Sequence, residues 1–228
     1  MHIEPGLIDG PKMALSYGTA AVSFSILGKL ALDHIKEKGL TSFAAKSLAA
    51  TVAVFTFFQV FFHVPVGVSE VHLILGTSLL LMLGAAPAAL GLAAGLLIQG
   101  LFFAPFDLPQ YGANITTLLV PLFAMQWCAR RVVEPNQAYV DLRYSQVFKL
   151  SAIYQGGIVS WVAFWAFYGQ GFGAESVQSV ASFGAAYMSV VLIEPLADLG
   201  LLALARAGKQ LSESAFARTL LNDRLYRA

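Results

Sequence analysis

The stretch HVPVGVSEVHL, from His63 to Leu73, lies between a long apolar segment and two apolar segments that are each short for a membrane crossing. The short segments cover residues 73–83 and 88–103, and GAAP at residues 84–87 is predicted to be the turn between them. A transmembrane helix needs roughly 20 apolar residues, so the loop before a short helix must dip into the membrane, where protein has to surround it. We therefore expect His72 below the membrane surface, at the amino-terminal end of the first short helix.

The composition places the whole chain in the membrane. Of its 228 residues, 57% are hydrophobic and only 12% are charged, about half the charged fraction of typical soluble domains. This predicts an all-α fold, a polytopic membrane helix bundle of about seven transmembrane helices. The predicted segments cover residues 13–35, 42–62, 73–83, 88–103, 114–129, 146–168 and 181–205. We expect a transmembrane bundle over residues 1–208, followed at 209–228 by an amphipathic cytoplasmic tail on the membrane or a partner.

The basic residues predict an orientation. Short cytoplasmic loops are enriched in lysine and arginine, and with the amino terminus outside, every basic residue except Lys12 lies at or near the cytoplasmic face. The start lacks the features of a secretory signal, so we expect it to be retained in a multi-pass protein of the cytoplasmic (inner) membrane. The net charge of +1 argues against a nucleic acid partner, which would need a concentrated basic surface.

The same topology brings three of the four histidines, His2, His63 and His72, to the outer face. The free amine of Met1, the backbone nitrogen of His2 and its imidazole can chelate one metal ion, which leaves one equatorial place for another histidine. Nitrogen ligands favour nickel, copper, cobalt or zinc over magnesium or calcium, and the planar chelate favours Ni(II) or Cu(II). Residue chemistry alone leaves His63 and His72 as alternatives for the fourth ligand.

Other polar residues in apolar surroundings have two readings each. Asn114 either caps the fifth predicted segment or orients a histidine. Glu194, near the middle of the seventh, is either a structural partner of neighbouring helices or a residue of substrate passage and coupling. No nucleotide-binding loop or hydrolytic cluster is present, so we expect no enzymatic activity, with ATP hydrolysis in separate subunits.

Four motifs carry a resemblance to a known family. The start MHIEPG, the loop HVPVGVSEVHL, the run LLIQGLFF at residues 96–103 and GAN at 112–114 resemble the CbiM/NikM family. That family comprises the substrate-specific membrane components of energy-coupling factor transporters, the ABC-type importers for cobalt and nickel. The resemblance covers Met1 to about Pro121 and continues more loosely to the region of Glu194.

The resemblance implies a seven-helix component whose amino terminus inserts into the bundle. By motif position the metal ligands fall on Met1, His2 and His72, while His63 and Asn114 become candidate surrounding residues. It also implies a membrane coupling subunit, two cytoplasmic ATPase subunits and, in some systems, a small extra membrane subunit. Cobalt or nickel would be the transported substrate, with no organic cofactor.

Two departures and two rival functions stay open at this point. Glu4-Pro5 and FDLPQYGAN at residues 106–114 differ from the family pattern and border the expected site, so the sequence does not separate cobalt from nickel. The rivals are a non-transporting membrane subunit or assembly factor of another complex and a stand-alone metal permease.

Overall fold

The computed structural model describes residues 3, 6–61, 63–208 and 219–227. Within these residues the chain forms seven α-helices and one two-stranded sheet. The helices are α1 Met13–Lys38, α2 Leu40–Gln59, α3 Gly76–Leu83, α4 Ala85–Phe102, α5 Tyr111–Val132, α6 Tyr144–Gln170 and α7 Ala174–Ala207. Short 3-10 turns occur at Gly10–Lys12, Pro105–Gln110, Tyr139–Asp141 and Asp223–Leu225. The seven-helix membrane fold expected from the sequence is confirmed.

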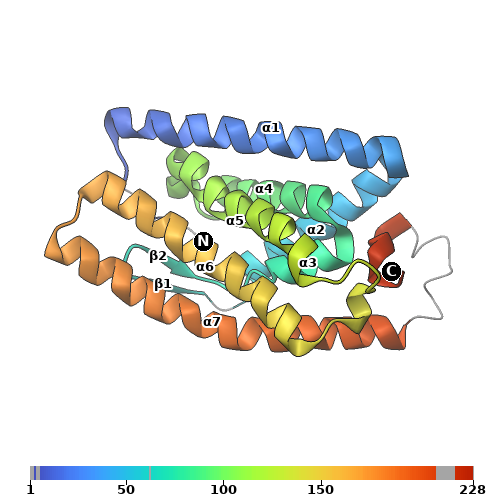
Figure 1. The fold of residues 1–228 in the computed structure, drawn as a ribbon. Coiled ribbons are helices and arrows are strands. Elements are labelled where there is room, and N and C mark those ends of the chain that lie inside the picture. The colour runs from blue at the N-terminus through green and yellow to red at the C-terminus, as the bar shows by residue number, and fades with distance from the viewer. Residues whose placement is uncertain (1–2, 4–5, 62, 209–218, 228) are drawn as a thin grey trace.

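The helices form one bundle in which α1 and α7 lie along opposite edges and α4 and α5 lie between them (Figure 1). Small residues let α2 and α4 pack closely. A Cβ atom added at Gly91 would lie 2.3 Å from the Cβ of Ala50, and one added at Gly95 would lie 2.7 Å from a methyl carbon of Val54. Close backbone approach through small residues is the usual way in which membrane helices associate.

Five helices in the described part of the chain are long and apolar enough to cross a membrane: α1 with its preceding turn, α2, α4, α6 and α7. The other two helices, α3 and α5, fall outside this group for separate reasons. With 8 residues, α3 rises only about 12 Å and cannot cross alone. With 22 residues, α5 is long enough, but Asn114, Thr116 and Thr117 make its buried first half more polar.

Several helix boundaries differ from the sequence-based expectation. Gly84 alone breaks the chain between α3 and α4, with a φ of 92° that favours glycine. Pro87 lies in the first turn of α4, where a missing N–H costs no intrahelical bond. The seventh helix begins at Ala174 rather than residue 181, because the polar residues before Ala181 form a helical extension beyond the apolar segment.

The stretch from His63 to Leu73 contains a β-hairpin that the sequence analysis did not predict. Strands β1 Val64–Val66 and β2 Ser69–Val71 pair antiparallel, with Val64 opposite Val71. The turn uses Gly67 at a φ of 60°, and a Cβ atom there would lie 2.2 Å from the carbonyl oxygen of Ser179 on α7. The hairpin turn is therefore pressed against α7. Val64 and Pro65 of β1 are exposed, so the protein covers this loop only in part.

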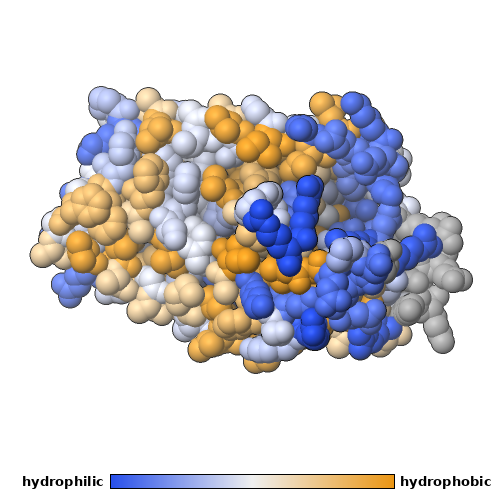
Figure 2. Space-filling model, viewed as in Figure 1, coloured by the Kyte–Doolittle hydropathy of each residue, from blue (hydrophilic) through white to orange (hydrophobic). Residues whose placement is uncertain are grey.

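The described part of the predicted tail, residues 219–227, packs against the bundle. The Asn222 N–H donates to the Met82 carbonyl oxygen at 2.6 Å, the Tyr226 hydroxyl donates to the Ala205 carbonyl oxygen at 2.8 Å, and Leu225 is fully buried. Hydrophilic residues gather at this end of the molecule, while apolar residues cover much of the surface between the two ends (Figure 2). The predicted amphipathic helix lies largely outside the described residues.

Candidate metal site

His72 directly follows strand β2 and is almost fully buried, with 1% of its surface exposed. Its Nε2 lies 2.9 Å from Oε2 of Glu70. Residues two apart on a strand point to the same face, which explains why this carboxylate reaches the imidazole. A carboxylate that accepts from one ring nitrogen sets the tautomer, and the other nitrogen then presents a lone pair. Sequence reasoning missed Glu70, although the two-residue spacing was visible.

Aromatic rings enclose His72 on two sides. The His63 ring stacks on it with a centroid distance of 5.2 Å and an interplanar angle of 16°. The Phe58 ring lies 5.3 Å away in a tilted arrangement. The structure thus brings the two candidate loop histidines together, with His72 buried and His63 exposed.

The amino-terminal segment reaches this loop through Ile3. Its side chain is fully buried, its N–H donates to Oδ1 of Asn114 at 2.8 Å, and it forms an antiparallel bridge with Ser69. Asn114 is the fourth residue of α5, and the N-cap position of this helix is Gln110, whose side chain makes no capping hydrogen bond. The capping role considered for Asn114 is therefore wrong, and its side chain holds the amino-terminal segment instead.

Met1 and His2, the two other predicted ligands, lie outside the described residues. Among the residues that the structure does describe, no group of three or more histidine, cysteine, aspartate or glutamate side chains is placed to hold a metal ion. His72 and Glu70 alone are too few ligands for a closed transition-metal site. A site at His72 would thus need donors from the amino terminus.

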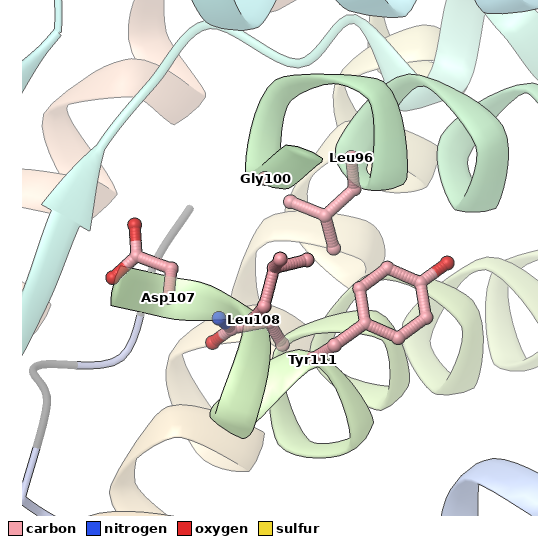
Figure 3. Close-up of a pocket in the computed structure, with 6 residues that line it drawn as sticks. Leu96, Gly100, Asp107, Leu108 and Tyr111 are labelled. Atoms are coloured by element: carbon pink, nitrogen blue, oxygen red, sulfur yellow. The ribbon is translucent and has the colours of Figure 1, made fainter. Parts of the chain in front are cut away.

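A small cavity of about 10 Å³ lies beside Asn114, with room for about one water molecule. Leu96 and Gly100 of α4 and Asp107, Leu108 and Tyr111 also line it (Figure 3). The carboxylate of Asp107 and the phenol of Tyr111 point in opposite directions, and Leu96 and Leu108 face each other between them (Figure 3). Tyr111 donates to the carbonyl oxygen of Ala93 at 2.8 Å, which ties α5 to α4.

Glu194 is fully buried and bonded to the chain just after His72. Its Oε1 accepts from the N–H groups of Ile74 and Leu75 at 2.8 and 2.9 Å. Its Oε2 accepts from the side-chain amide of Gln155 on α6. The structural pairing considered for Glu194 is present, and its partners include the loop that carries His72.

Comparisons with known proteins identify the family of the chain. A family model described as the cobalt uptake substrate-specific transmembrane region, CbiM, matches residues 2–210. The chain belongs to the CbiM family. It is therefore a membrane component of a metal transporter. No curated protein sequence matches the chain significantly.

Two solved structures share the CbiM-type fold seen here. The crystal structure of a transition metal transporter has a TM-score of 0.67 at 18% identity, over 96% of this chain and 96% of the other. That of a truncated transition metal transporter has a TM-score of 0.65 at 17% identity, over 94% of this chain and all of the other. At this identity the similarity concerns the fold, which extends over nearly the whole chain.

Proposed function

We propose that the protein is the substrate-binding membrane subunit of an ATP-driven importer of cobalt or nickel. In this proposal the amine of Met1, the amide and imidazole nitrogens of His2 and the imidazole of His72 hold the ion. Metal binds from the outer face and displaces protons and water. Separate ATPase subunits then drive its release into the cell through a membrane coupling subunit, sometimes with a small extra membrane subunit.

The placement of Ile3 carries the proposal. Ile3 follows His2 directly in the chain and is held by Asn114 and Ser69 next to the strand that ends before His72. The bridge pairs Ile3 with Ser69, which lies three residues before His72. The amino-terminal segment and the loop that carries His72 are thus joined at this bridge, although they lie far apart in the sequence.

The surroundings of His72 support a role as a ligand. Metal-binding histidines usually share a proton with a carboxylate or carbonyl through their second nitrogen, and Glu70 occupies that position at 2.9 Å. The stacked ring of His63 and the tilted ring of Phe58 limit rotation of the imidazole. We assign His63 and Asn114 to the surroundings of the metal rather than to its ligands.

The charge distribution supports the proposed orientation. The ion pairs Arg206–Asp141, Arg143–Glu134 and Lys38–Asp223 all involve the loops and helix ends near the carboxy-terminal segment. We place this end in the cytoplasm, where ATPase and coupling subunits would dock, and the amino terminus outside, in the cytoplasmic membrane.

Metal titration of the full-length protein in detergent tests the proposal. We expect Ni²⁺ or Co²⁺ affinity to fall by at least about 10-fold in His72→Ala, because one of few ligands is lost. Residues added ahead of Met1 should have a comparable effect, because they convert the free amine to an amide. His34→Ala is the matched control, since His34 packs on Phe43 in a different part of the bundle. Unchanged affinity in both test proteins would refute the site.

Uptake assays separate the proposed function from its rivals. The importer requires metal accumulation in cells that depends on ATPase and coupling subunits, which should also co-purify with this protein. Accumulation without any ATPase would instead identify a stand-alone permease. Association with an unrelated complex and no accumulation would identify a non-transporting subunit.

A further inference from the structure

The short helix α3 lacks a cap from its own sequence. The residue before it, Leu75, has a left-handed conformation with φ 53° and ψ 36°, and no side chain in that position caps the helix. The first N–H groups of any helix have no intrahelical acceptor, and the left-handed region is unfavourable for a residue with a Cβ atom such as leucine. Something outside the segment must therefore hold this turn in place.

Helix α7 provides the missing acceptors. Glu194 accepts from the consecutive N–H groups of Ile74 and Leu75 at 2.8 and 2.9 Å. One helical turn further along, the carboxylate of Asp198 accepts from the hydroxyl of Ser78. All these side chains are buried. Two carboxylates of α7 thus act as a cap for the amino-terminal end of α3, where negative charge is favourable.

A second helix fixes the direction of Glu194. Gln155 of α6 donates its side-chain amide to the carboxylate oxygen that does not bond the loop, and Tyr154 packs next to it. A Cβ atom at Gly76, the first residue of α3, would lie 2.2 Å from the Tyr154 ring. The start of α3 is therefore held by α7 through hydrogen bonds and by α6 through close packing.

We infer that Glu194 is a positioning residue of the metal site, which fixes His72 through the backbone of Ile74 and Leu75. Only one residue, Leu73, separates His72 from the bonded Ile74. On its other side, His72 is held by the hairpin. Loss of the Glu194 bonds would free the downstream side and let the imidazole leave the metal. This inference rests on the proposed metal site and adds the residue that orients its loop ligand.

Copper binding to Glu194→Ala tests the inference, because the Cu²⁺ spectrum reports how many nitrogens surround the ion. We expect affinity to fall about 10- to 100-fold, as for other residues that orient ligands. At saturating Cu²⁺, the electron paramagnetic resonance spectrum should move toward that of His72→Ala. A purely structural role would lower stability without changing the spectrum of the folded fraction. Glu194→Gln should rescue both affinity and spectrum, since an amide oxygen can still accept from both N–H groups.

Glu175→Ala is the matched control, because Glu175 is an exposed carboxylate in the first turn of the same helix. If Glu194→Ala does not fold, Gln155→Leu removes the donor that orients Glu194 and should shift the spectrum in the same direction. Wild-type affinity and a wild-type spectrum in Glu194→Ala would overturn this inference but leave the proposed function intact. If only Gln155→Leu folds, the same result in that variant would have the same meaning. A wild-type protein that binds no Cu²⁺, Ni²⁺ or Co²⁺ would overturn the proposed function together with it.

Discussion

Substitution of Gly169 by alanine should weaken metal binding, although Gly169 lies in the last turn of α6. A Cβ atom at Gly169 would lie 1.9 Å from the carbonyl oxygen of Leu7 and 2.9 Å from its carbonyl carbon. Ordinary contacts between heavy atoms lie near 3.5 Å, so the backbone at Leu7 must move by roughly 1.5 Å. Lys12, whose ammonium donates to the Gly169 carbonyl oxygen at 2.6 Å, ties the same two segments together.

Such a displacement acts on the site through the chain. Leu7 lies four residues after Ile3, and binding sites tolerate displacements of only about 0.5 Å. We expect Ni²⁺ or Co²⁺ affinity in Gly169→Ala to fall by about 10-fold or more, since a ligand is misplaced. Amide exchange at residues 6–12 should become faster. Calorimetric metal titration and exchange followed by mass spectrometry measure these two effects.

The control for this prediction lies on the same helix. A Cβ atom at Gly156 meets nothing within 4 Å, so Gly156→Ala should leave metal affinity unchanged and stabilise α6 by up to about 1 kcal/mol through helix propensity. Wild-type affinity and wild-type exchange in Gly169→Ala would show that the amino-terminal segment does not depend on its contact with α6. The reasoning about its placement would then be wrong.

Three further outcomes follow from the same contacts. Asn114→Leu should weaken metal binding and lower thermal stability. The buried Ile3 N–H loses its acceptor in this variant, at a cost of about 1–3 kcal/mol. Wild-type metal affinity together with wild-type thermal stability would contradict this prediction. Gly91→Val should destabilise the fold by about 1–3 kcal/mol through overpacking against Ala50, measured by thermal unfolding in detergent. Gly200→Val, at an open position of α7, is its control, and equal stability of the two variants would refute the close α2–α4 contact. Metal binding should release about two protons near pH 7, from the amine and the amide, and should weaken as pH falls. Calorimetry in buffers of different ionisation enthalpy counts these protons, and a release of zero would exclude the amide nitrogen as a ligand.

The sequence predicted much of the fold because a membrane bundle is specified by the lengths of its apolar segments. Each of the seven predicted segments corresponds to one α-helix in the described residues. The errors occur where polar residues continue a helix, as before Ala181, or where one glycine is enough to end it, as at Gly84. The β-hairpin was missed because three-residue strands are too short to produce a recognisable alternation.

For the candidate site, composition and motif suggested the residues, and the tertiary structure shows what Asn114 and Glu194 contact. The sequence shows Asn114 as a polar residue in an apolar segment, whether it caps a helix or orients a histidine. Only the folded chain shows that it bonds Ile3, 111 residues away. Glu194 is a costly buried carboxylate in any membrane helix, and its partners Ile74 and Leu75 lie 120 and 119 residues away. Side-chain chemistry and apolar length are local properties that can be read along the sequence. Which acceptor satisfies which buried N–H depends on how α3, α5 and α7 pack, and that is decided only when the bundle assembles.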